Sequence, residues 1–154
     1  MGARVIALDV SDERLARAKE LGADAVINPT KDDPVQAIKQ LTHGLGAHAS
    51  IDASSSPLAR KQAVQCVRTW GKACYVGEGG SVSIDVSPDM LRRQVTIIGS
   101  WTFSTIGQQD CARFVADRGI DVDALFTHRW GFDDAVKAYQ IFDKQTSGKG
   151  VFLF

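Results

Sequence analysis

Short apolar segments alternate with amphipathic ones along the first half of this sequence, and no other feature constrains the fold as strongly. Four such apolar segments occur, at residues 4–9, 25–27, 47–52 and 72–77. Short apolar runs of this kind are typical of strands that are buried on both faces. Strands that alternate with helices predict a parallel sheet with helices packed against it. The sequence therefore indicates an α/β fold with a doubly wound parallel sheet.

Helix start signals fall between these strands. Ser11 can cap a helix that Gly22 can end. Start signals at 33–34 and 56–57, each completed by a proline, predict helices through about residues 41 and 69. In the less regular second half we expect an extended segment at 82–86, a short helix from 87, strands at 95–101 and 150–154, and helices at 108–118 and 133–146. No linker interrupts the pattern, so residues 1–154 are interpreted as a single domain.

Composition excludes several classes of partner. Lysine plus arginine number 18, and so do aspartate plus glutamate, a balance that argues against nucleic acid or a membrane surface. No apolar run approaches the roughly 18 residues needed to span a bilayer, and the first residues lack the apolar stretch of a secretory signal. The three cysteines are scattered and odd in number, which favours free thiols in a reducing compartment. We therefore expect a cytoplasmic protein.

Asp9 is the first candidate for a binding residue. It stands at the carboxyl end of the first expected strand, and ligands bind at that edge of an open parallel sheet. A carboxylate there can accept both hydroxyl protons of an adenine ribose and would repel a 2′-phosphate, so it favours NAD over NADP. The same spacing is equally compatible with an aspartate that caps the following helix or faces solvent.

A glycine-rich phosphate turn is missing from its usual place. In a dinucleotide fold the pattern G-x-G-x-x-G lies about 20 residues before such an acid, and only eight residues precede Asp9. The glycines at 44–46 and 77–80 do not open a helix in the required register and are interpreted as turn residues. In the strand order 3-2-1-4-5-6 the missing strand is the central one. We therefore expect the strands at 4–9 and 47–52 not to pair directly, and the chain to be part of a longer one.

Metal-ligand patterns are also missing. Catalytic zinc needs cysteine, histidine or carboxylate ligands that converge on one point, and the sequence has neither C-x-x-C nor H-E-x-x-H. His43 and His48 only flank a Gly-Leu-Gly turn. The cysteines and tryptophans are more typical of packing, and we expect no metal site within this chain.

Eight segments together carry a resemblance to a known family. In chain order they are residues 2–9 (GARVIALD), 13–24 (ERLARAKELGAD), 25–29 (AVINP), 51–54 (IDAS), 71–77 (GKACYVG), 95–101 (VTIIGSW), 127–129 (THR) and 147–152 (SGKGVF). The ordered set resembles the coenzyme-binding part of zinc-type medium-chain alcohol dehydrogenases, with the sorbitol and threonine dehydrogenases as the nearest subgroup. The resemblance implies a partial Rossmann domain over residues 1–154 that begins at the second βα unit.

The resemblance also implies cofactor-binding roles for nine positions. Asp9 matches the acid that binds the adenine ribose, Arg14 a basic residue near the adenosine, and Lys149 a position that often carries an arginine on the pyrophosphate. The others match backbone beside the cofactor (Ala53 and Ser54), the lining of the nicotinamide (Val76 and Gly77) and groups that bind its carboxamide (Ser100 and Thr102). Ser55 departs from the family, which usually has glycine there.

For the complete enzyme, the resemblance implies hydride transfer between a secondary alcohol or polyol and NAD. Zinc would act there as a Lewis acid in a separate N-terminal domain, so this chain has no catalytic residue of its own and should be inactive alone. The resemblance further implies a homodimer formed through the edge strand at 95–100. A non-catalytic nucleotide-binding or scaffold module is one alternative. A zinc-independent quinone reductase relative is another, but that branch commonly favours NADP, and Asp9 counts against it.

Overall fold

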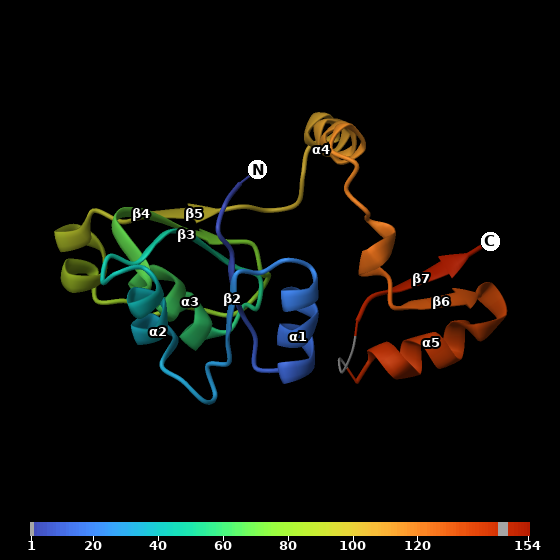
Figure 1. Cartoon of the computed structure of the whole chain (residues 1–154), viewed down its shortest axis with the longest axis horizontal. Coiled ribbons are helices and arrows are strands. Elements are labelled where there is room, and N and C mark those ends of the chain that lie inside the picture. The colour runs from blue at the N-terminus through green and yellow to red at the C-terminus, as the bar shows by residue number, and fades with distance from the viewer. Residues whose placement is uncertain (1, 145–147) are drawn as a thin grey trace. The chain divides into compact units, whose positions relative to one another are not determined.

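The computed structural model describes residues 2–144 and 148–154. The chain packs as two compact units, Met1–Thr102 and Phe103–Phe154. In chain order the first unit contains β1 (Ile6–Leu8), α1 (Asp12–Glu20), β2 (Ala25–Ile27), α2 (Pro34–Leu41), β3 (Ala47–Asp52), α3 (Pro57–Gln65), β4 (Val67–Tyr75), the single π turn η1 (Val86–Met90), the 3₁₀ turn η2 (Leu91–Arg93) and β5 (Thr96–Gly99) (Figure 1).

All strand pairs of the first unit are parallel, which confirms the α/β class. β1 pairs with β2, with Ala7 opposite Val26. β3, β4 and β5 form a separate three-stranded sheet in that order, in which Ala73 lies opposite both Ser50 and Ile97. Within the described residues no ladder joins β1 to β3. The expectation that these two strands do not pair directly is thus confirmed.

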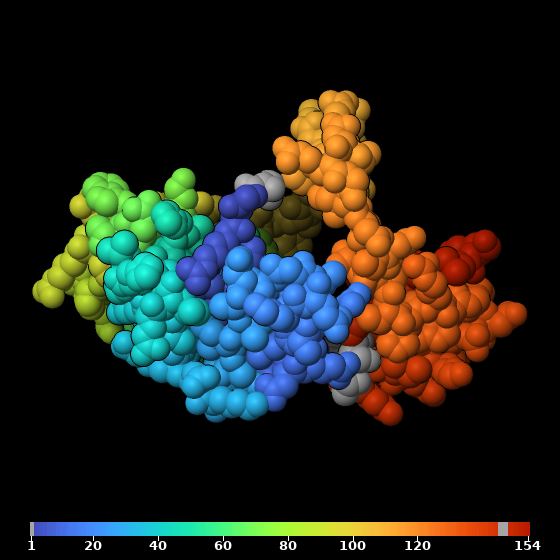
Figure 2. Space-filling model, viewed as in Figure 1, coloured from blue at the N-terminus to red at the C-terminus, as the bar shows by residue number. Residues whose placement is uncertain are grey.

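Side-chain packing connects the two sheets of this unit. The buried core brings together Ile27 of β2, Ile38 of α2, Val64 of α3 and Ala73 of β4. In the space-filling view the N-terminal segment, in blue, lies directly against α2, in cyan (Figure 2). There the guanidinium of Arg4 donates to the carbonyl oxygen of Leu41 at 3.0 Å. Among the described residues, the two sheets are therefore held together by a shared apolar core and not by strand pairing.

The helix starts follow the capping signals in the sequence. Ser11 Oγ accepts the backbone N–H of Arg14 at 3.4 Å. Asp33 caps α2 by accepting the N–H groups of Val35 and Gln36 at 2.9 and 3.2 Å. These caps satisfy donors that have no partner within the helix. The starts of α1 and α2 are thus encoded locally.

The end of α3 differs from the expectation. We expected this helix to run to about Thr69, but it ends at Gln65 and β4 begins at Val67. Val67 is fully buried and pairs with Ala47, so core packing and strand pairing outweigh the helical pattern. The pairing then shifts register, and Trp70 takes a positive φ of 61° before the ladder resumes at Lys72.

The second unit contains α4 (Thr105–Asp117), η3 (Asp123–Leu125), β6 (His128–Gly131), η4 (Phe132–Asp134), α5 (Ala135–Phe142) and β7 (Gly150–Leu153). β6 and β7 pair in parallel. The ring of Phe142 packs edge-on against those of His128 and Trp130. β6 was not expected from the sequence, and α4 begins three residues before the expected position because Ser104 caps it. Of the expected helix at 133–146, residues 135–142 form α5, residues 143 and 144 form a turn, and residues 145 and 146 lie outside the described residues.

No helix in the described ranges combines the length and apolar character needed to cross a membrane.

Candidate functional site

The carboxyl ends of β3, β4 and β5 form one continuous edge. Beyond β3, the carbonyl oxygen of Asp52 accepts the N–H groups of Val76 and Gly77 at 2.9 and 3.1 Å. Beyond β4, the carbonyl oxygen of Tyr75 accepts the N–H of Ser100 at 3.0 Å. This edge gathers five of the nine predicted residues, namely Ala53, Ser54, Val76, Gly77 and Ser100.

Two loops meet closely at this edge, residues 53–55 and residues 77–80. A Cβ added at Gly77 would lie 2.7 Å from the backbone nitrogen of Ser55, and one added at Gly80 would lie 2.3 Å from the carbonyl oxygen of Ser55. Gly80 also has a positive φ of 70°. Only glycine fits such an approach between two backbones. Gly77 and Gly80 therefore allow the two loops to pack closely, and the 77–80 segment does not open a helix.

A buried carboxylate organises the first of these loops. Asp52 Oδ1 accepts the N–H and the hydroxyl of Ser54 at 3.2 and 2.6 Å. Asp52 Oδ2 accepts the N–H of Ser55 at 3.2 Å and Nε of Arg60 at 3.3 Å. Burial by itself raises the pKa of the Asp52 carboxyl, but these hydrogen bonds outweigh burial and hold the pKa below its ordinary value.

The buried guanidinium of Arg60 connects Asp52 to the second loop. Besides Asp52, it binds the carbonyl oxygen of Gly77 through Nη2 at 2.6 Å. It lies 5.5 Å from the ring centroid of Tyr75, and the Tyr75 hydroxyl donates to the carbonyl oxygen of Arg60 at 3.1 Å. Sequence reasoning missed both Asp52 and Arg60, because nothing in a helical arginine shows that it reaches a loop 17 residues further along the chain. The run of polar residues after Asp52 was the one local signal available.

Asp9 follows β1, as expected, and its carboxylate is 30% exposed. One oxygen accepts the N–H of Ser11 at 2.9 Å, and the other lies 3.6 Å from the Arg14 guanidinium. The two predicted adenosine residues are thus brought together. Asp9 also supports the start of α1, so the structural role left open by the sequence is present, and a ribose-binding role remains compatible with its exposure.

The two remaining predicted residues lie elsewhere. Thr102 ends the first unit with an exposed side chain and a positive φ of 49°. Lys149 belongs to the second unit, where its N–H donates to Thr127 Oγ1 at 3.0 Å and its carbonyl oxygen accepts the Thr127 N–H at 2.9 Å. Lys149 is therefore in a different unit from the other eight predicted residues.

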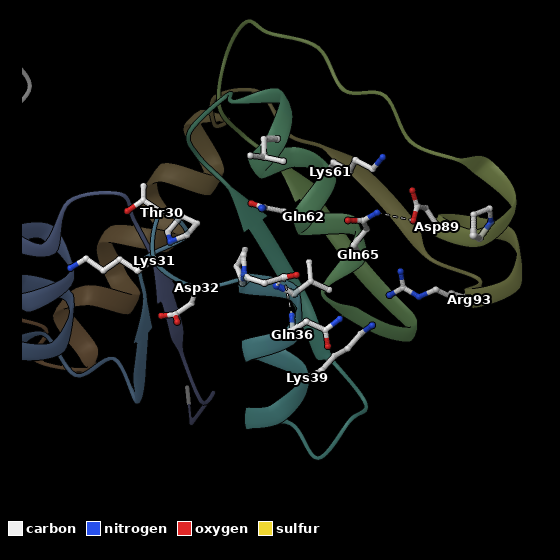
Figure 3. Close-up of a pocket in the computed structure, with 16 residues that line it drawn as sticks. Thr30, Lys31, Asp32, Gln36, Lys39, Lys61, Gln62, Gln65, Asp89 and Arg93 are labelled. Carbon is white, nitrogen blue, oxygen red and sulfur yellow. Dashed lines mark hydrogen bonds between the residues drawn. The ribbon is translucent and has the colours of Figure 1, made fainter.

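A cavity of about 830 Å³ opens between the start of α2, α3 and the η1–η2 segment (Figure 3). Its wall carries both signs of charge, including Lys39, Lys61 and Asp32. Gln65 of α3 donates to Asp89 across one side of it at 3.2 Å. None of the nine predicted cofactor residues lines this cavity, so it is distinct from the strand edge described above.

Within residues 2–144 and 148–154, no three histidine, cysteine or acidic side chains converge as metal ligands would. Cys66, Cys74 and Cys111 are free thiols. Burial raises the pKa of the Cys66 thiol, which suits a residue that packs in the core. The described residues therefore do not fit a zinc ion.

Comparisons with known proteins point to one family. The family model described as zinc-binding dehydrogenase matches residues 1–118. The chain is 37% identical over 152 residues to the uncharacterized zinc-type alcohol dehydrogenase-like protein YphC of Escherichia coli, covering 98% of this chain and 43% of that protein. It is 31% identical over 157 residues to L-threonine 3-dehydrogenase of Pyrococcus abyssi, covering 97% of this chain and 44% of that enzyme.

Among solved structures, benzyl alcohol dehydrogenase of Acinetobacter calcoaceticus superposes with a TM-score of 0.85 at 30% identity, covering 97% of this chain and 42% of that one. The chain thus spans less than half the length of the relatives it matches. The family match, the relatives and the Rossmann-like fold agree, and this chain therefore belongs to the zinc-binding dehydrogenase family, whose members are zinc-type alcohol dehydrogenases.

Proposed function

We propose that residues 1–154 form part of the NAD-binding domain of an alcohol or polyol dehydrogenase. The observation that carries this proposal is the strand edge where Ala53, Ser54, Val76, Gly77 and Ser100 meet. Carboxyl edges of parallel strands are where open α/β sheets bind ligands. The close approach of Gly77 and Gly80 to the neighbouring loop leaves mostly backbone and small side chains to face a flat cofactor.

The proposed contacts divide between the two halves of the cofactor. Asp9 and Arg14 would hold the adenosine, and Lys149 the pyrophosphate. Ala53, Ser54, Val76 and Gly77 would lie beside the nicotinamide, with Ser100 and Thr102 near its carboxamide. NAD supplies the site that accepts hydride, and the residues of this chain bind and orient it.

The complete enzyme, in this proposal, oxidises a secondary alcohol or polyol, and zinc is held by residues outside this chain. The chain alone is then inactive and has no catalytic residue. We further propose a homodimer formed through the strand at 95–100 and a cytoplasmic location, which suits three free thiols.

Calorimetry with NAD and NADP tests cofactor binding. We expect NAD to bind more tightly, because a 2′-phosphate beside the Asp9 carboxylate is repelled. The affinity should be weaker than about a micromolar, or roughly −8 kcal/mol, because this sequence has no glycine turn to receive the pyrophosphate.

The substitution Asp9→Asn should remove most of the preference for NAD. Asp12→Asn is the matched control, since it removes a charge from the first turn of α1 where the carboxylate instead pairs with Lys31 at 2.5 Å. Equal affinity for both dinucleotides would contradict the role proposed for Asp9, and submicromolar binding would contradict the expected weak affinity.

A further inference from the structure

Arg60 connects the carboxylate that holds the first loop of the candidate site to the backbone of the second loop. Its guanidinium binds the carboxylate of Asp52, which carries the first loop, and the carbonyl oxygen of Gly77, which begins the second. The Arg60 and Asp52 side chains are 9% and 3% exposed. The bond to Gly77, at 2.6 Å, is the shorter of the two.

The arrangement is more specific than an ion pair that only anchors a helix. To anchor α3, Arg60 would need to bind only the carboxylate of Asp52. Here a second arm of the guanidinium reaches the backbone of the 77–80 loop, while the Tyr75 ring and hydroxyl contact the same residue. The planar fork of arginine can hold a carboxylate and a carbonyl at once, which the single ammonium of lysine does not reproduce.

We propose that Arg60 is a positioning residue for the nicotinamide half of the cofactor. By holding Gly77 at a fixed distance from Asp52, it sets the spacing between the loops at 53–55 and 77–80 and keeps their backbones ready for the ligand. Asp9 and Arg14, assigned to the adenosine half, belong to the end of β1 and to α1, whereas the bonds of the Arg60 guanidinium go to Asp52 and Gly77. This inference rests on the proposed binding of NAD.

The test compares NAD with AMP, which carries only the adenosine half, on the full chain and its Arg60→Lys variant. Binding is followed by titration of backbone amide resonances. We expect NAD binding by Arg60→Lys to weaken about tenfold, the size expected for one lost charge-assisted hydrogen bond. AMP affinity should stay within about twofold, and the amide signals of residues 77–80 should shift without ligand.

Arg93→Lys is the matched control. Arg93 also donates to two backbone carbonyl oxygens, but these belong to Val64 and Val67 and lie outside both loops. Its variant should lower both affinities equally or not at all. Should Arg60→Lys fail to fold, the double variant Asp52→Asn/Arg60→Met removes both buried charges together and still lacks the bond to Gly77. It should show the same selective loss.

The outcomes separate two kinds of failure. A folded Arg60 variant that keeps the wild-type ratio of NAD to AMP affinity overturns the positioning role, and so does an equal loss of both affinities. If the wild-type chain binds neither NAD nor AMP, the proposed function fails and the positioning role with it.

Discussion

Ser55 shows at the scale of one residue how the site is held in shape. It stands where the family resemblance leads one to expect glycine, and it adopts the left-handed conformation that glycine favours, with φ of 59°. Its N–H donates to Asp52 and its hydroxyl to the carbonyl oxygen of Ser54 at 2.6 Å. The loop thus keeps its glycine-like backbone by means of local hydrogen bonds.

Replacing Ser55 by glycine should therefore stabilise the chain slightly. The left-handed conformation costs a non-glycine residue about 1–2 kcal/mol, and glycine loses about 0.5–1 kcal/mol in backbone freedom on folding. The bond from the Ser55 hydroxyl to Ser54 is exposed, so water can replace it in the variant. We therefore expect Ser55→Gly to raise the free energy of unfolding by about 0.5–1 kcal/mol, measured by urea denaturation. Ser54→Gly is the control: it removes the hydroxyl bond to Asp52 and should destabilise. A loss of stability in Ser55→Gly as large as in the control would refute the argument.

The residue scale also shows what sequence alone can predict. Ala53, Ser54, Val76 and Gly77 stand directly after the paired strands β3 and β4, so a parallel sheet brings them to one edge whatever the packing. The role of Arg60 was not predictable, because it depends on how α3 faces the 77–80 loop. That orientation is set by the burial of Val64 and Cys66 in the core, which no local pattern records.

At the scale of elements, β5 is the edge strand through which we propose that two copies of the chain pair. It pairs with β4 and, among the described residues, has no strand on its other side. Thr96 and Ile98 are exposed, whereas Ile97 packs against the core. An exposed edge with these side chains is open to pairing with another chain unless it is covered.

We expect Ile98→Lys to convert a homodimer into a monomer in light scattering. Ile98 is 39% exposed, so a charge there disturbs an interface without entering the core, as a lysine at 97 would. Ile106→Lys, which changes an exposed isoleucine of α4, should leave the association state unchanged. A wild-type chain that is already monomeric, or an Ile98→Lys variant that remains dimeric, would exclude this interface.

Elements were predictable in type more often than in length. Strands β1 to β3 and the starts of α1 to α3 follow from apolar runs, caps and prolines. The end of α3 was not predictable, because Val67 is placed by its pairing with Ala47 across 20 residues of sequence and by burial. β6 carries a histidine and an arginine in four residues, so its strand character comes from pairing with β7.

At the scale of the whole molecule, the chain packs as two units and spans less than half the length of its relatives. The strand order of a dinucleotide fold predicted that β1 and β3 would not be neighbours, and the topology confirms it. The division at Thr102 was not predicted, because the sequence around it has no linker composition.

The isolated chain should oxidise no alcohol. Its described residues bring no metal ligands together, and we have assigned none of them a catalytic role. With NAD, zinc and a panel of polyols, the absorbance of reduced cofactor should not rise above that of the solution without protein. Turnover near the usual enzyme median of roughly 10 per second would require a catalytic site that the proposal does not contain. L-threonine 3-dehydrogenase, assayed in parallel with threonine, verifies the assay.

The missing ladder between β1 and β3 also bears on how the first unit opens. Main-chain bonds link β1 to β2 and β3 to β4, whereas in the part of the chain that the structure describes the two sheets are connected by packed side chains such as Ile27 and Ile38. Native proteins unfold partially in contiguous cooperative segments. A segment that makes fewer contacts with the rest of the protein opens at a lower free energy. The segment from β1 to β2 should therefore behave as a separate foldon, whose amide hydrogens exchange with solvent while those of β3 and β4 remain protected.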